Sequence, residues 1–124
     1  MKVSITKVYT FEACHSLPEY VGPCHNLHGH SYKLEVTVSG DIREDGPFKG
    51  MLMDLKDLKL FITTYFGHLD HSNLNDSYEN PTAENMAVDI FQQLSKHIEE
   101  TYDNVVVDKV KLWETETGCA EVSR

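Results

Sequence analysis

Strict alternation of apolar and polar residues from His30 to Ser39 constrains the fold of this chain more than any other feature of its sequence. The apolar side chains lie at every second position, at Tyr32, Leu34, Val36 and Val38. Successive side chains of a β-strand point to opposite faces, so the segment predicts a strand with one apolar and one polar face. A sheet with one polar face is typical of antiparallel pairing.

Five other segments predict the remaining elements. A weaker alternation over residues 3–13 predicts a preceding strand, and residues 104–114 and 118–122 predict two strands later in the chain. Apolar residues at helical spacing predict amphipathic helices over residues 55–66 and 82–102. The resulting order, β-β-α-α-β-β, predicts an α+β fold with both helices on one side of an antiparallel sheet.

Both predicted helices begin near residues whose side chains accept hydrogen bonds from free backbone N–H groups. Asp54 precedes the first helix, which we expect to end at Gly67. Asn80 and Thr82 are both suitable caps for the second helix, and the sequence does not distinguish between them.

Composition excludes several classes of function. Twenty acidic residues against eleven basic ones give a formal net charge of −9, whereas a nucleic-acid or membrane-surface binder needs a basic face. No apolar run approaches the ~18 residues of a membrane span, and Met1 to Ser4 do not open a signal peptide. Three cysteines do not make a disulfide framework. We therefore expect one domain, residues 1–124, in the reducing cytoplasm, without nucleic-acid or membrane partners.

Histidine carries the strongest chemical signal, because four of the seven histidines lie within residues 15–30. His28 and His30 point to the same face of an extended segment, so their imidazoles can converge on one ion. If the first two strands form a hairpin, His15 at the end of the first strand returns beside them. Three neutral imidazoles with an open fourth position are the ligand set of a catalytic zinc ion. The alternative is that all three histidines are structural.

Cys24 lies four residues before His28. As a fourth zinc ligand it would close the site and make it structural. As a free thiol beside a dication it would ionise readily and act as a base. Spacing alone leaves both hypotheses open. Cys14 and Cys119 fall within strand patterns and are predicted to be structural, since small buried cysteines are common.

Two more positions have both a functional and a structural interpretation. In the loop between the helices, Asp70 can orient its neighbour His71, or both can belong to a solvated loop or a helix end. Glu114 follows Leu112 on the apolar face of the last long strand, where it either protrudes from the strand end or anchors a ligand in a pocket. The other histidines are predicted to be surface or capping residues: His25, His68 and His97.

Several of these segments together resemble the 6-pyruvoyl-tetrahydropterin synthase family, in the right order and over nearly the whole chain. The matching segments are Phe11–His15, Cys24–His30, Leu69–His71, Asn80–Asn85 and Trp113–Thr115. The family includes the bacterial 6-carboxy-5,6,7,8-tetrahydropterin synthases of queuosine biosynthesis. In that branch the cysteine is followed by three residues and then by His-Gly-His, as in this chain, whereas the animal enzymes use a longer spacer.

The resemblance implies a fold and an assembly. The fold is the tunnelling fold, a four-stranded antiparallel sheet with two helices on one face. Members form homo-oligomers, trimers or hexamers, whose sheets join into a barrel with active sites at subunit interfaces. Such closure would remove the exposed sheet edges of the separate chain.

The resemblance also implies roles for individual residues. By match of motif, Cys24 would be the general base, and Asp70 with His71 would form the relay that moves its proton. The zinc ligands would be His15, His28 and His30.

Two further matches concern the pterin substrate. Glu114 would accept two N–H groups from the guanidine-like edge of the pterin ring. Thr82 matches a family position near the pterin, but the next position, often hydroxylic in the family, is Ala83.

The implied activity is that of a zinc-dependent lyase acting on 7,8-dihydroneopterin triphosphate. Triphosphate is eliminated, and the bacterial branch also releases acetaldehyde and leaves 6-carboxytetrahydropterin. Another pterin reaction on the same fold, such as 6-pyruvoyl-tetrahydropterin formation, epimerisation or an aldolase reaction, is one alternative. A non-catalytic metal-binding or pterin-binding module is the other.

Overall fold

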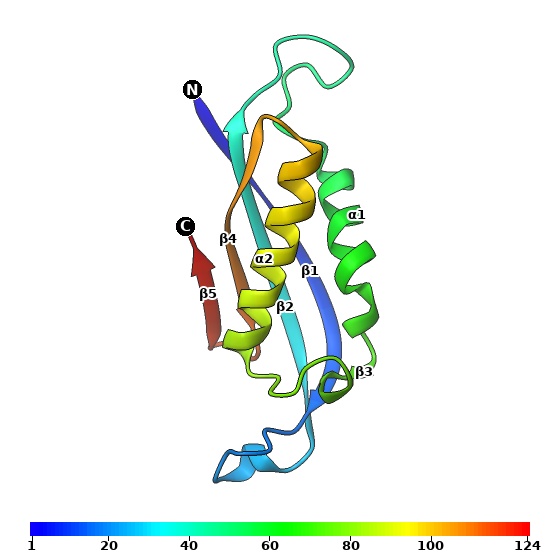
Figure 1. Ribbon diagram of the computed structural model, residues 1–124, viewed down its shortest axis with the longest axis vertical. Helices are drawn as coiled ribbons and strands as arrows, with labels where there is room; N and C mark the ends of the chain where they lie inside the picture. The colour runs from blue at the N-terminus through cyan, green and yellow to red at the C-terminus, as the bar shows by residue number, and fades with distance from the viewer.

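Two helices lie side by side on one face of a β-sheet in the computed structural model, which describes residues 1–124 (Figure 1). The loop between the first two long strands projects from one end of the sheet, and the loop leading to the first helix lies at the other end. Neither helix combines the length and apolarity that crossing a bilayer requires. In chain order the elements are β1 (Lys2–His15), β2 (His28–Asp41), α1 (Leu55–Phe66), β3 (Ser72–Asn73), α2 (Ala83–Thr101), β4 (Val105–Trp113) and β5 (Cys119–Ser123).

The sheet has the strand order β3-β1-β2-β4-β5. β1 and β2 form a long antiparallel hairpin whose register runs from Lys2 opposite Asp41 to His15 opposite His28. β2 pairs with β4, and β4 pairs with β5, in both cases antiparallel. The predicted α+β architecture, with both helices on one face of an antiparallel sheet, is therefore confirmed.

The sheet contains five strands rather than the expected four. The additional strand, β3, consists only of Ser72 and Asn73 and runs parallel to β1, opposite Ala13 and Cys14. A two-residue strand leaves no periodic pattern in the sequence, and its pairing depends on the path of the loop between the helices. This pairing holds the loop between the helices against the end of β1.

The core lies between the helices and the sheet, as the hydrophobic periodicity predicts. Leu34, Val36 and Val38 of β2 are fully buried. The buried face of α2 consists of Ala83, Met86, Ala87, Ile90, Leu94 and Ile98. The second helix is capped by Thr82, whose hydroxyl oxygen accepts a hydrogen bond from the N–H of Asn85 at 3.1 Å. The structure thus distinguishes between the two candidate caps.

Replacing Gly40 with alanine is expected to destabilise the protein, because β2 passes very close to the backbone before β4. A Cβ atom here would lie 1.8 Å from the carbonyl oxygen of Asn104. We expect the free energy of unfolding to fall by about 1–3 kcal/mol, as for other overpacked sites, measured by urea denaturation. Gly67→Ala is the control, because a Cβ there meets Thr63 at an ordinary 3.6 Å. Equal stability of the two variants would contradict the conclusion that the backbone at Asn104 leaves no room for a side chain at position 40.

Candidate metal and substrate site

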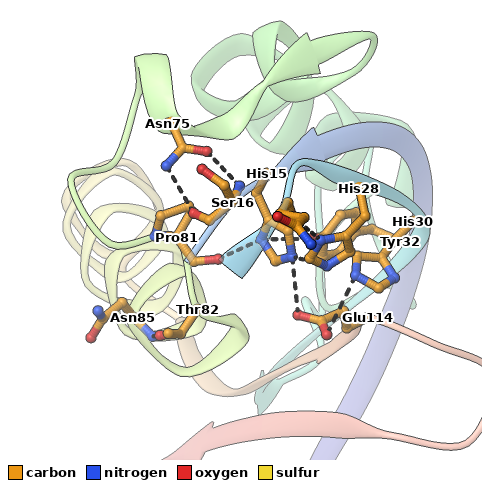
Figure 2. A network of polar contacts seen from close by, with 11 residues as sticks. His15, Ser16, His28, His30, Tyr32, Asn75, Pro81, Thr82, Asn85 and Glu114 are labelled. Carbon is orange, nitrogen blue, oxygen red and sulfur yellow. Dashed lines mark hydrogen bonds and ion pairs between the residues drawn. The ribbon is translucent and has the colours of Figure 1, made fainter. Parts of the chain in front are cut away.

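The β1–β2 hairpin brings three histidines together at one end of the sheet. His15 lies directly opposite His28, and Ala13, two residues earlier, lies opposite His30, so all three imidazoles are on the same face. One donor nitrogen from each ring lies within 4.8 Å of the other two. Figure 2 shows the three rings converging. The predicted convergence of these side chains is therefore present in the fold.

Backbone carbonyl groups fix the proton positions on two of these rings. Nδ1 of His15 lies 2.8 Å from the carbonyl oxygen of Pro81, and Nδ1 of His28 lies 2.7 Å from that of Asn26. A carbonyl oxygen only accepts hydrogen bonds, so both Nδ1 atoms carry the proton. In the neutral ring Nε2 is then unprotonated. This Nδ1–H tautomer is the one that binds a metal ion through Nε2.

The unprotonated Nε2 atoms lie close enough together to bind one cation. Nε2 of His15 and Nε2 of His28 lie 3.1 Å apart, and two lone pairs at this distance repel each other unless a cation lies between them. Ligands of one zinc ion, with bonds of about 2.0–2.1 Å, are roughly 3.3 Å apart. Nε2 of His30 is buried without a hydrogen-bond partner. The donor set therefore fits a divalent metal ion.

The surroundings keep the third imidazole neutral. Burial lowers the pKa of His30, and the charge of Glu114 opposes this shift only in part. A neutral imidazole is the form that coordinates metals. His15 is fully buried, so a substrate cannot approach the cluster from the side of this ring.

Glu114, the first residue after β4, faces the histidine cluster. Its carboxylate oxygens lie 3.6 Å from Nε2 of His30 and 4.0 Å from Nε2 of His15. It also lines a cleft of about 280 Å³ between the start of α2 and the β4–β5 hairpin. Of the two interpretations of this carboxylate, the structure therefore shows the residue in a pocket and not protruding from the strand end.

Thr82 lies beside the cluster but has a structural contact of its own. Its hydroxyl oxygen caps α2 by accepting from the N–H of Asn85. The residue before it, Pro81, supplies the carbonyl that holds His15. The start of α2 thus contributes directly to the orientation of a metal-site ring (Figure 2).

Asp70 and His71 form a pair at the outer edge of β1. Oδ1 of Asp70 accepts hydrogen bonds from the backbone N–H of Glu12 and from Nδ1 of His71, each at 2.9 Å. The hydrogen bond from Glu12, and then the contact with His71, lower the pKa of Asp70. The side chain of His71 is 80% exposed. His71 and His30 line one open cleft, but no hydrogen bond or ion pair joins the pair to the histidine cluster.

Cys24 lies in a short 3₁₀ turn, Pro23–His25, within the projecting β1–β2 loop. Its thiol is half-buried and is not among the donors that lie within 4.8 Å of one another. The cluster thus contains nitrogen donors without sulfur, which favours the free thiol over the fourth ligand. Cys14 is half-buried, with its thiol 3.7 Å from the carbonyl of Ser72. Cys119 is exposed, against expectation, because it lies on the outward face of the edge strand β5.

The remaining histidines lie outside the cluster. His25 and His68 are exposed, and His97 stacks on Tyr65 with ring centroids 3.9 Å apart. Three contributors to the site were not predicted: the carbonyl groups of Asn26 and Pro81, which have no side-chain signal in the sequence, and Tyr32. The hydroxyl of Tyr32 lies 3.3 Å from Nδ1 of His15, and burial raises the pKa of this tyrosine, which keeps it protonated.

Comparison with known proteins gives consistent matches. A family model described as 6-pyruvoyl tetrahydropterin synthase matches residues 4–124. The chain is 43% identical over 96 residues to the 6-carboxy-5,6,7,8-tetrahydropterin synthase of Synechocystis sp., covering 74% of each chain. It is 32% identical over 140 residues to the protein of that name from Haemophilus influenzae, covering 94% of this chain and 96% of the relative. The solved 6-pyruvoyl tetrahydropterin synthase of Caenorhabditis elegans has a similar fold, with a TM-score of 0.82 and 27% identity over 100% of this chain and 96% of that one.

Proposed function

The chain belongs to the 6-pyruvoyl tetrahydropterin synthase family of lyase-type pterin enzymes, and on this basis we propose that it is a zinc-dependent 6-carboxy-5,6,7,8-tetrahydropterin synthase of queuosine biosynthesis. Its substrate is then 7,8-dihydroneopterin triphosphate, and its products are 6-carboxytetrahydropterin, acetaldehyde and triphosphate. The names of the Synechocystis and Haemophilus relatives support this branch. So does the short spacer between Cys24 and His28. The observation that carries the proposal is the cluster of three histidine donors beside a carboxylate, without sulfur.

Zinc is the metal that this donor set favours, since neutral imidazoles are ordinary zinc ligands and three of them leave a position for substrate. His15, His28 and His30 would hold it. A zinc ion bound here supplies Lewis-acid polarisation of the side-chain oxygens of the substrate, which acidifies neighbouring C–H and O–H bonds. The carbonyls of Pro81 and Asn26 keep two of the ligands in the binding tautomer.

Proton transfer falls to residues outside the metal cluster. The Cys24 thiolate would remove a proton from the substrate side chain. Asp70 stays ionised and holds the proton of His71 on Nδ1, so Nε2 of His71 is free to accept a proton and return it. A thiolate and an oriented imidazole together can move protons between adjacent carbon atoms as the side chain rearranges.

Glu114 is suited to hold the pterin ring. Its two carboxylate oxygens can accept the paired N–H groups of the guanidine-like edge. The cleft beside it is bounded by Ala83 and Thr115 and lies next to the histidine cluster. The ring in this cleft would direct the substrate side chain toward the metal. Thr82 can add a hydroxyl contact while its oxygen caps α2, because a hydroxyl group has a proton and a second lone pair besides the one that accepts from Asn85.

The charge of the chain supports an active site shared between subunits. The segments that build the site contain no lysine or arginine over residues 8–32, 60–95 and 112–123. We propose that a second copy supplies cations for the triphosphate in addition to Lys33 and Lys111, which flank Trp113 beside the site. In addition, β1 pairs with β3 only at Ala13 and Cys14, so most of its outer edge is open for another strand. We accordingly propose a homotrimer or homohexamer with active sites at its interfaces.

Mixed oligomers test whether chains share the site. Cys24→Ala and His71→Ala are each expected to be inactive alone. Because His71 is exposed at the edge of β1, we expect it to serve a neighbouring chain. Random co-assembly of equal amounts then restores about a quarter of the sites, since an intact Cys24 and an intact His71 meet from different chains. Turnover of co-expressed variants measures this. No recovery would contradict a shared site.

Product identification tests the proposed reaction. Zinc-loaded protein is incubated with 7,8-dihydroneopterin triphosphate, and the products are analysed by mass spectrometry. We expect 6-carboxytetrahydropterin with equal amounts of acetaldehyde and triphosphate. Triphosphate without acetaldehyde would instead indicate the 6-pyruvoyl branch. Pterin binding without any product would indicate a binding module, and either result would overturn the proposal.

A further inference from the structure

We propose that Asn75 is a positioning residue of the metal site, which holds the end of β1 so that His15 presents Nε2 to the ion. The inference rests on the proposed function only in requiring that the three histidines bind a metal. Asn75 lies in the connection between the helices, more than fifty residues from His15, and contacts no ligand ring itself. It acts through Ser16, the residue that follows His15 (Figure 2).

The amide of Asn75 satisfies both backbone groups of Ser16. Its Oδ1 accepts from the N–H of Ser16 at 2.8 Å, and its Nδ2 donates to the carbonyl oxygen of Ser16 at 2.9 Å. A side-chain amide with one donor and one acceptor used in this way replaces a neighbouring strand. It therefore ties down the backbone at the point where β1 ends and its N–H and C=O groups would otherwise turn to solvent.

These bonds continue the register of the parallel β1–β3 pairing. β3 places Ser72 opposite Ala13 and Asn73 opposite Cys14, and the pairing ends there. Two residues further along both segments, the amide of Asn75 meets Ser16. His15 is thus the one residue between two bonded positions on the outer edge of β1. Its backbone is held on both sides of the metal ligand.

Asn75 is itself firmly placed. It lies in the 3₁₀ turn Leu74–Asp76, where Leu74 is fully buried, and its N–H donates to Oδ1 of Asn73 at 3.0 Å. The same connection continues to Pro81, whose carbonyl binds Nδ1 of His15. One segment therefore holds both the backbone and the ring of this ligand. Residues that orient a ligand in this way contribute measurably to metal affinity.

The test compares zinc affinity in two amide variants. Asn75→Leu keeps the size of the side chain and removes both bonds to Ser16. Asn104→Leu is the matched control, because Asn104 also makes two hydrogen bonds to the backbone: its Nδ2 donates to the carbonyl oxygens of Asp41 and Leu52, each at 3.1 Å, at the opposite end of the sheet. The dissociation constant for zinc is measured by competition with a chromophoric chelator. The visible spectrum of the cobalt-loaded protein reports the ligand geometry.

We expect Asn75→Leu to weaken zinc binding by about 10-fold, the lower end of the loss that follows removal of a direct partner of a ligand, and to alter the cobalt spectrum. Asn104→Leu should lower the urea midpoint and leave both metal readouts at wild-type values. Wild-type zinc affinity in Asn75→Leu would overturn the inference, because the residue would then be only structural. If Asn75→Leu does not fold, Asn75→Asp takes its place, because it keeps the acceptor and loses the donor. Its zinc affinity and cobalt spectrum are then compared with those of Asn104→Leu.

The outcome is separable from that of the proposed function. If the wild-type protein binds zinc and yields no tetrahydropterin product, the proposed function fails, and the affinity ratio between variants still decides the role of Asn75. If the wild-type protein binds no zinc, both fail. Weakened zinc binding in Asn75→Leu but not in Asn104→Leu supports the inference, whether or not the wild-type protein forms a tetrahydropterin product.

Discussion

Cys24→Ala is expected to leave zinc bound at one ion per chain while turnover falls by about 10³-fold, the usual contribution of a positioned general base. The reason is that the thiol lies outside the group of mutually close metal donors, which contains only imidazoles. Zinc content is measured by atomic emission on dialysed protein, and turnover by triphosphate release. His25→Ala, an exposed neighbour in the same turn, is the control for disturbance of the loop and should resemble the wild type.

The two possible roles of Cys24 give opposite results in this experiment. If zinc is lost together with the thiol, sulfur is a ligand and the site is structural. If zinc and turnover both persist, the thiol is neither ligand nor base, and proton abstraction must be assigned to another group. Retained zinc with lost turnover is the one result that agrees with proton abstraction by the Cys24 thiolate and proton transfer through His71.

His30→Ala should have the second large effect, because it removes a metal donor with little change to the fold. We expect zinc affinity to fall by more than about 100-fold, beyond the range seen when only an outer contact of a ligand is removed, and turnover to be lost with it. Nε2 of His30 makes no hydrogen bond, so its removal leaves no buried partner unsatisfied. His15 is less suitable for this test, because it is fully buried and bonded to Pro81.

The control for this variant is His97→Ala. His97 stacks on Tyr65 between the two helices and has no contact with the cluster. Its zinc content and zinc affinity should equal those of the wild type. Wild-type zinc affinity in His30→Ala itself, measured by chelator competition, would show that the metal binds elsewhere.

Hydrophobic periodicity was sufficient to predict the long elements and the buried faces of β2 and α2. The same-face rule for alternate strand residues, combined with the hairpin, placed His28 and His30 together and brought His15 to them. These predictions succeed because they depend on local geometry that the backbone imposes. The prediction that Glu114 occupies the apolar face of its strand has the same origin.

Contacts made by the connection between the helices could not be predicted in this way. β3, the carbonyl of Pro81 and the amide of Asn75 meet β1 across sequence separations set by the path of an irregular loop. The sequence also did not distinguish Asn80 from Thr82, since both side chains can cap a helix. In each case the same residues are compatible with several local conformations, and tertiary packing selects one of them.

X-ray absorption at the zinc edge is the most direct test of a three-histidine zinc site, because it identifies the atoms bound to the metal in the whole protein. We expect only nitrogen and oxygen neighbours at about 2.0–2.1 Å, with the outer-shell scattering of three imidazole rings. A sulfur neighbour at about 2.3 Å would contradict a site made of histidines alone, because cysteine would then close it. Fewer than three imidazoles would contradict it equally.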